Sequence, residues 1–372
     1  PVDAPPFDRS NVDGFAVRAA DTYGSSDAQP AYLELAGESL MGKTPTDTVS
    51  LGRLVKIHTG AMLPEGADAV VMLEYTRDRG AGMIEIARQV APGENSIATG
   101  EDVRAGDFLM AAGQVLRPQD LGGLASIGVT RVPVARAPRV GLISGGDEVV
   151  SPDEEPGPAQ VRDINSFTLE ALVREAGGEP LRLGIAADSF EALHDLVERA
   201  LHDCDAVVVS GGSSVGTRDV TRAVIDSYGD PGVVVHGVAL RPGKPTILAV
   251  VRGKPFFGLP GNPVSAMCTF GLFVQPTIRR LLGRSEFPPP LTVRARLLRN
   301  VPSVSGLEHY TQVRLVRRDG ALYADPVLGK SNLIFTMVRA DGFIRVPLEL
   351  SGYAEGSEVE VQPYSLWLPD GE

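Results

Sequence analysis

Cysteine is scarce in this sequence, since Cys204 and Cys268 are the only two among 372 residues. Neither belongs to a CxxC pair and both stand among apolar neighbours, so we expect buried free thiols rather than a disulfide or a nucleophile. The five histidines show no HxxH or HExxH spacing, and no serine has the GxSxG context, which disfavours zinc hydrolysis and Ser-His-Asp catalysis. No signal-peptide pattern is visible, and we expect a cytoplasmic protein.

Positive charge is in the minority. The chain has 35 Lys and Arg against 47 Asp and Glu, a formal net charge of −12. Such a surface repels phosphate backbones and anionic headgroups, so we expect no binding to nucleic acid or to a membrane, and any anion site must be a local pocket. Residues 255–278 carry no charged side chain, but four prolines interrupt them, so they predict a buried strand, loop and helix rather than a membrane span.

Low-complexity sequence is absent, and 43% hydrophobic residues suffice for several cores. The first hundred residues show short strand patterns between Gly and Pro turns, and a helix is expected from Pro118 to about Gly128. Strands and helices then alternate, which predicts an α/β domain with a mostly parallel sheet covered on both faces. After the "EFPPPL" linker, period-two patterns predict a small β domain. The predicted division is a β-rich domain at 1–104, a helical linking segment at 105–137, an α/β domain at 138–285 and a C-terminal β domain at 286–372.

Three glycine-rich loops follow predicted strands of the α/β domain: "SGGDE" (144–148), "SGGSSVGTRD" (210–219) and "GLPGNP" (258–263). In an open α/β sheet such loops form the ligand crevice, and glycine lets backbone N–H groups approach a phosphate or oxyanion. Tight turns without a ligand are the alternative. Neither GxxxxGK[ST] nor GxGxxG occurs, which disfavours a standard nucleotidase and an NAD dehydrogenase. The candidate binding residues in these loops are Ser144, Gly145, Gly146, Ser210, Gly211, Gly212, Ser214, Gly216, Gly261 and Asn262, with Asn262 also a candidate N-cap before Pro263.

Charged side chains gather at the same predicted edge. The acidic ones are Asp147, Glu148, Asp188 and Asp219, and carboxylates without convergent His or Cys suit a hard cation such as Mg²⁺. Asp188 and Asp219 could instead only cap helices. Arg241 and Lys244 of "RPGKP" could hold an anion, with a solvated basic turn as the alternative.

Together these strings carry a resemblance. "SGGDE", "SGGSSVG", "RPGKP" and "GLPGNPVSA", in this order and spacing, are similar to the molybdenum insertase family, the MoeA type, which the C-terminal domain of gephyrin also represents. The strings "PPFDRSNVDGFAV", "IHTGAMLPEGADAVV" and "GEDVRAGD" match further motifs of that family. The resemblance covers essentially the whole chain.

The resemblance implies a multidomain fold with N-terminal β and helical linking domains, a central molybdopterin-binding-type α/β domain and a C-terminal β-barrel-like domain. It implies a homodimer whose cleft both subunits complete. The implied reaction inserts molybdenum from molybdate into adenylylated molybdopterin and releases AMP with the help of Mg²⁺.

Carried over position by position, the resemblance adds candidate residues. Those implied to be catalytic are Asp13, Asp102, Glu148, Asp188 and Asp219, with Glu148 and Asp219 also implied for the metal. Those implied to bind the cofactor, besides the loop residues above, are Thr59, Arg241, Lys244, Pro260, Pro263 and Ser331. The sequence departs from the family pattern at Arg241, where the family usually has Lys. It also departs at Gly237 and Gln312, where the family often has a basic residue.

Two other functions stay open. The chain could be a molybdopterin-binding scaffold or carrier with weak or no insertase activity, as the lost cationic positions would allow. It could also be a Mg²⁺-dependent nucleotide hydrolase of another kind, a hypothesis that rests on the acidic residues of the predicted edge alone. The five separated carboxylates named as catalytic favour the insertase, because a scaffold has no need of them.

Overall fold

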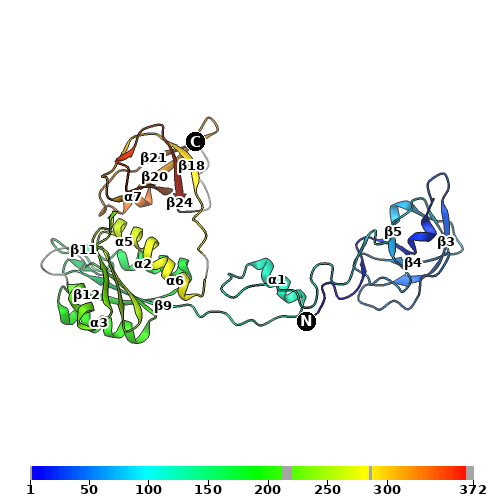
Figure 1. Ribbon diagram of the computed structural model, residues 1–372, viewed down its shortest axis with the longest axis horizontal. Helices are drawn as coiled ribbons and strands as arrows, with labels where there is room; N and C mark the ends of the chain where they lie inside the picture. Colours follow the sequence, from blue (N-terminus) through cyan, green and yellow to red (C-terminus); the bar gives the residue numbers. More distant parts are fainter. Residues whose placement is uncertain (1, 212–219, 285–286, 366–372) are drawn as a thin grey trace. The chain divides into compact units, whose positions relative to one another are not determined.

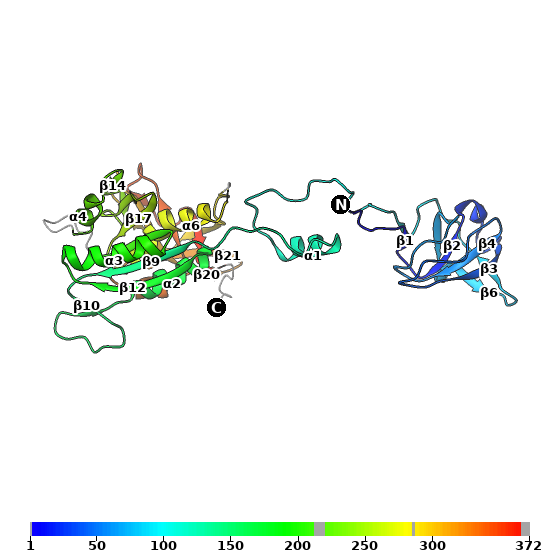
Figure 2. The same cartoon turned by 90° about the horizontal axis from the view of Figure 1, so that it is seen from below.

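The computed structural model describes residues 2–211, 220–284 and 287–365 and forms two compact units (Figures 1 and 2). The first unit spans Pro1–Ala111 and Val115–Pro133, and the second spans Ala112–Gln114 and Val134–Glu372. Each unit is described by itself.

A six-stranded mixed sheet forms the body of the first unit, in the order β5-β2-β4-β3-β7-β6. Its strands are β2 (Gly14–Val17), β3 (Ala31–Ser39), β4 (Arg53–Ile57), β5 (Ala69–Met72), β6 (Thr76–Asp78) and β7 (Met83–Ile86), and the short elements beside it are β1 (Arg9–Ser10), β8 (Ser96–Ile97), η1 (Ala19–Thr22) and η2 (Leu73–Tyr75). Side chains alternate along β2, with Phe15 and Val17 in one hydrophobic cluster and Ala16 in another. Because residues of a strand point alternately to opposite faces, this sheet is packed on both sides.

Helix α1 (Pro118–Ser126) belongs to the same unit and confirms the predicted helix. Pro118 occupies its first turn, where the missing N–H costs nothing. The backbone N–H of Arg117 donates to Asp120 Oδ2 at 2.8 Å. The turn that follows contains Gly128 at φ +80°, a conformation that glycine adopts without strain.

The second unit contains the central sheet, ordered β12-β9-β13-β17-β16-β14. The strands are β9 (Arg139–Gly145), β12 (Glu179–Ala186), β13 (Ala206–Ser210), β14 (Gly232–His236), β16 (Ile247–Val251) and β17 (Lys254–Leu259), and β10 (Val149–Val150) pairs with β11 (Val161–Arg162) beside it. Neighbouring strands from β12 to β17 are parallel. Strand β16 is antiparallel to both of its neighbours, β17 and β14. The mostly parallel sheet predicted from the sequence is confirmed.

Helices cover both faces of this sheet (Figure 1). On one face lie α2 (Asn165–Ala176), α5 (Pro263–Thr269), the π-helical η3 (Phe270–Val274) and α6 (Gln275–Leu281), and on the other lie α3 (Phe190–Asp203) and α4 (Val220–Ser227). On α3, Leu193, Val197 and Ala200 are buried at helical spacing, and the Ser189 side chain caps its start by accepting from the Ala192 N–H at 3.3 Å.

The C-terminal part of this unit is a closed barrel, because β20 pairs with β21 on one side and with β22 on the other. The strands are β18 (Val293–Leu297), β20 (Glu308–Arg318), β21 (Ala321–Pro326), β22 (Gly342–Val346) and β24 (Glu358–Pro363), with β19 (Val301–Pro302), β23 (Gly352–Tyr353) and helix α7 (Phe335–Val338) beside them. The short strand β15 (Leu240–Arg241), from the loop after β14, pairs with the start of β20. The predicted C-terminal barrel-like domain is confirmed.

Both cysteines are free thiols, as predicted, although only Cys204 is fully buried and Cys268 is half-buried. Within the described ranges, no helix combines the length and apolar character needed to span a membrane.

Candidate functional site at the carboxyl edge of the central sheet

Strand register brings the three glycine-rich loops to one level. Ser210, the last residue of β13, pairs with Ser144 of β9 on one side and with Leu259 of β17 on the other. Because these strands are parallel, the loops that follow them leave the sheet at the same edge. The convergence predicted from the sequence is therefore observed for the described parts of the loops.

The backbones of these loops are in close contact. The Gly211 N–H donates to the Leu259 carbonyl at 3.0 Å. Gly211 has φ +97°, and a Cβ there would lie 2.2 Å from the Gly145 carbonyl oxygen. A Cβ on Gly261 would lie 3.5 Å from Gly211 Cα. Glycine is thus required at position 211 for the loops to approach one another.

The acidic residues of the first loop are exposed, and Asp147 is linked to the loop that follows β12. Asp147 Oδ1 accepts from the Asp188 backbone N–H at 2.9 Å. A Cβ on Gly146, which has φ +142°, would lie 2.7 Å from Glu148 Oε2, so the Glu148 carboxylate lies over this glycine. Asp188 is not a helix cap, because Ser189 caps α3.

Four predicted residues lie outside the described part of the chain, namely Gly212, Ser214, Gly216 and Asp219. Among the residues that are described, no group of three or more His, Cys, Asp or Glu side chains could hold a metal ion. The predicted Mg²⁺ ligand Glu148 therefore has no preformed set of protein ligands in that part of the chain.

The predicted basic turn, residues 241–245, lies at the same edge because it belongs to the loop that connects the end of β14 to the start of β16. The Gly237 N–H donates to the Thr246 carbonyl at 2.9 Å. A Cβ on Gly243 would lie 2.4 Å from Thr269 Cγ2, so this loop packs on α5. Arg241 and Lys244 are exposed, and within the described ranges neither forms a salt bridge.

Ser331, from the C-terminal part of the unit, is held against the "GLPGNP" loop. Its carbonyl accepts from the Val264 N–H at 3.1 Å, and its Oγ accepts from Asn262 Nδ2 at 3.1 Å. Asn262 occupies the N-cap position of α5 as predicted, with Pro263 next, but its side chain makes no capping bond. It bonds to Ser331 instead. Pro260, within the same loop, is buried.

Sequence reasoning missed Asn165, the first residue of α2. Its side chain is 8% exposed, and Nδ2 donates to the Gly261 carbonyl at 2.8 Å. Its Oδ1, like the buried Oγ atoms of Ser144 and Ser210, has no hydrogen-bond partner among the described residues. In the sequence, Asn165 is marked only as a polar residue directly before the apolar helical pattern of "SFTLEAL". A polar residue in that position is typical of any helix start.

Two predicted residues meet in the first unit. Asp13 Oδ1 accepts from the Thr59 backbone N–H at 3.0 Å, and this hydrogen bond lowers the pKa of the exposed Asp13 carboxyl. The N–H favours the ionised form because it can bond to the carboxylate. The Asp102 side chain is exposed, and its backbone N–H donates to the Ala4 carbonyl at 3.0 Å.

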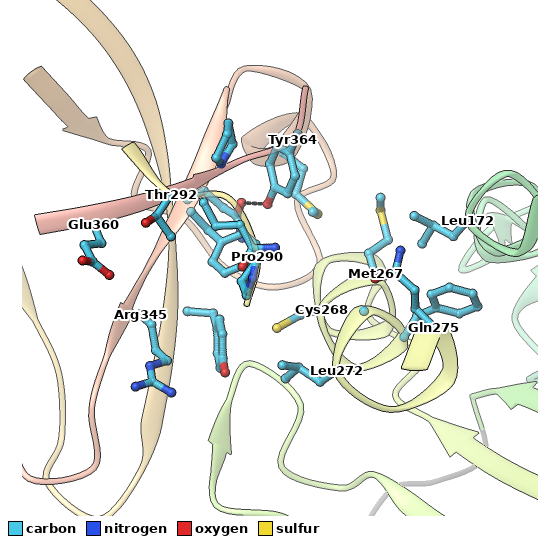
Figure 3. A pocket seen from close by; sticks show the side chains of 18 of the residues that line it. Leu172, Met267, Cys268, Leu272, Gln275, Pro290, Thr292, Arg345, Glu360 and Tyr364 are labelled. Carbon is cyan, nitrogen blue, oxygen red and sulfur yellow. Dashed lines mark hydrogen bonds between the residues drawn. The ribbon is translucent and has the colours of Figure 1, made fainter. Parts of the chain in front are cut away.

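A cavity of about 1260 Å³ lies elsewhere in the second unit, between the helical segment from α5 to α6 and the barrel. Figure 3 shows Cys268 and Leu272 on its helical side and Tyr364 on its barrel side. Burial raises the pKa of the Cys268 thiol to about 12, so this thiol stays protonated and weakly nucleophilic. No residue predicted for the site lines this cavity, and the chemistry at the sheet edge argues for the edge as the functional site.

Family models match most of the chain. A MoeA N-terminal region (domain I and II) matches residues 1–128, a probable molybdopterin binding domain matches 141–280, and a MoeA C-terminal region (domain IV) matches 294–364. The chain belongs to the MoeA family. The resemblance found in the sequence is thereby confirmed.

Individual MoeA relatives agree along nearly the full chain. The molybdopterin molybdenumtransferase of Bacillus subtilis is 35% identical over 96% of this chain and 84% of its own. That of Haemophilus influenzae is 33% identical over 99% of this chain and 90% of its own. A solved molybdopterin biosynthesis MoeA protein from Pyrococcus horikosii has a TM-score of 0.83 and 40% identity, covering 99% of this chain and 90% of its own.

These relatives bear on several predictions. They confirm the assignment to a family of transferases and support a place for the chain in molybdenum cofactor biosynthesis. The ligand roles of the individual MoeA site residues, the dimer and the Mg²⁺ remain predictions.

Proposed function

We propose that this chain inserts molybdenum from molybdate into adenylylated molybdopterin and releases AMP in a Mg²⁺-dependent step. The observation that carries the proposal is the convergence of Gly145, Gly211 and Gly261 at one sheet edge, in a chain whose relatives are named molybdopterin molybdenumtransferase. The exposed carboxylates and cations lie on loops at that same edge.

Anion binding falls to the cations and to the backbone. Molybdate and the pyrophosphate of the substrate are both anions, and the chain carries a net charge of −12. Local positive groups must therefore offset the acidic edge. Arg241 and Lys244 suit this role, because both are exposed and free of salt bridges with described residues. In this proposal Pro260, Pro263 and Ser331 shape the wall beside them.

Mg²⁺ fits this edge in one specific way. It binds through one or two carboxylates together with substrate phosphates and water, so the lack of a three-residue cluster in the described ranges is no obstacle. Glu148 would be one ligand and Asp219, which lies outside the described residues, another. The ion would polarise the phosphoanhydride bond between AMP and molybdopterin for cleavage by water. Asp188, and Glu148 when it does not bind the ion, would pass protons to the oxygen atoms that leave molybdate as water.

We also propose a homodimer in which both subunits complete the cleft. Asp13, Thr59 and Asp102 belong to the first unit, and the sheet-edge residues belong to the second. A partner subunit could supply one of these two sets to the other. We likewise propose the division of the chain into four domains, with boundaries after residues 104, 137 and 285. We also propose a cytoplasmic location.

An AMP-release assay tests this function. Purified protein is incubated with adenylylated molybdopterin and Mg²⁺, with and without molybdate. An insertase releases AMP in step with molybdenum uptake, whereas a scaffold binds the substrate and releases none. A Mg²⁺-dependent hydrolase of another kind releases AMP equally well without molybdate.

A further inference from the structure

Ser144, Ser210 and Asn165 lie on one side of the central sheet. In β9, Val140 and Leu142 pack in the cluster that contains the α2 and α5 side chains. Since side chains two residues apart share a face, Ser144 continues that face past the end of the core, and Ser210 does the same after Val208. Asn165 begins α2 on the same face and reaches the Gly261 carbonyl.

All three side chains are buried, and each carries an atom with no hydrogen-bond partner in the described part of the chain. Ser144 is 3% exposed, Ser210 is 2% exposed and Asn165 is 8% exposed. Among the described residues no group bonds to Ser144 Oγ, Ser210 Oγ or Asn165 Oδ1. Buried polar atoms are normally paired, because leaving them unpaired costs free energy. Three such atoms at the edge where the loops converge therefore point to a ligand.

The Asn165 amide fixes what kind of group that ligand must offer. The Gly261 carbonyl can only accept a hydrogen bond, so the Asn165 atom that faces it at 2.8 Å must be the donor Nδ2. The remaining atom, Oδ1, is an acceptor. An ionised phosphate or molybdate oxygen can only accept and therefore cannot satisfy it, whereas an N–H group can.

We propose that Asn165, with Ser144 and Ser210, binds the pterin ring of the substrate by its N–H edge; the proposal rests on the function proposed above. A pterin carries N–H donors at its 2-amino group and at N3, and these satisfy Asn165 Oδ1. The two serine hydroxyls can donate or accept and bond to the ring atoms beside them. The pterin then lies on the α2 and α5 side of the edge, and the anionic part of the substrate extends to Arg241 and Lys244.

An experiment that changes the ligand and the protein separately and together tests this contact. Tetrahydropterin, its 2-deamino analogue and its N3-methyl analogue compete with metal-free molybdopterin for the wild type and for Asn165→Ala. We expect the wild type to discriminate against at least one analogue by about tenfold, and Asn165→Ala to lose that discrimination. The matched control is Ser166→Ala on the same helix turn, which should bind as the wild type does.

The opposite outcomes overturn the proposal. If Asn165→Ala weakens the binding of all three probes equally, Asn165 only supports the Gly261 loop. If the wild type discriminates against neither analogue, no N–H contact exists. A wild type that discriminates as expected but releases no AMP would instead contradict the proposed function and leave this contact standing.

The two serines give an independent test, because neither hydroxyl has a hydrogen bond to another described residue that its removal would break. Ser144→Ala and Ser210→Ala should melt no lower than the wild type, since each removes a buried polar atom that has no partner within residues 2–211, 220–284 and 287–365. Each substitution should weaken the binding of metal-free molybdopterin severalfold. Wild-type affinity in both variants would overturn their share in the contact.

Discussion

A Cβ atom on Gly211 would lie 2.2 Å from the carbonyl oxygen of Gly145. Gly211→Ala should therefore lower the free energy of unfolding through both the clash and the positive φ of +97°. The matched control is Gly253→Ala, at φ +76° with open space around its Cβ. We expect Gly211→Ala to cost about 1–3 kcal/mol more than the control in urea unfolding. Equal losses in the two variants would contradict the close approach.

Gly261 tests the same contact at lower strain. A Cβ there would lie 3.5 Å from Gly211 Cα, an ordinary contact distance. Gly261→Ala should fold and bind metal-free molybdopterin nearly as the wild type does, whereas the extra methyl groups of Gly261→Val must displace the Gly211 loop. We expect Gly261→Val to weaken binding about tenfold or more with the fold retained. Unchanged affinity for Gly261→Val in a binding titration would remove this loop from the pocket wall.

Glu148→Gln separates a chemical role from a structural one. The exposed carboxylate contributes little to packing, so stability should change by less than ~1 kcal/mol. Turnover should fall by ~10²–10⁴ if the charge binds Mg²⁺ or carries a proton, while binding of adenylylated molybdopterin persists. Glu154→Gln, which is exposed in the same segment, is the matched control. Normal AMP release by Glu148→Gln would end the catalytic assignment.

Asp13 makes a prediction about pH. Its folded pKa is lowered from the ordinary value of 3.8, first of all by the Thr59 backbone N–H. Its contribution to stability is therefore present above the unfolded pKa and lost as the pH falls through the folded pKa. Carboxyl NMR should show Asp13 titrating below 3.8, and it should stay low in His58→Ala because His58 is only a minor cause. An Asp13 pKa at or above the ordinary value would contradict the hydrogen bond.

The fold was largely predictable because its elements follow local rules. The spacing of Leu193, Val197 and Ala200 predicts α3, and the apolar run of β13 predicts a buried strand. Parallel strand order then places the loops after Ser144 and Ser210 together. These features depend on periodicity and on topology, both of which are written in the sequence.

The site was less predictable where it depends on which partner a polar side chain chooses. Asn262 has the residue type and position of a helix cap, yet its amide bonds to Ser331, which is 69 residues away. Asn165 reads as a plain helix start, yet its amide reaches Gly261, 96 residues away. Such contacts are set by tertiary packing, and no local pattern encodes them.

The central claim is that molybdenum insertion and AMP release are one reaction of this chain. The most direct measurement quantifies AMP and molybdenum-loaded cofactor in the same reaction, with adenylylated molybdopterin, molybdate and Mg²⁺ supplied. Our account predicts one AMP for each molybdenum inserted, and neither product when Mg²⁺ is removed by a chelator. AMP formed without inserted molybdenum, or no AMP from folded protein that binds the substrate, would contradict it.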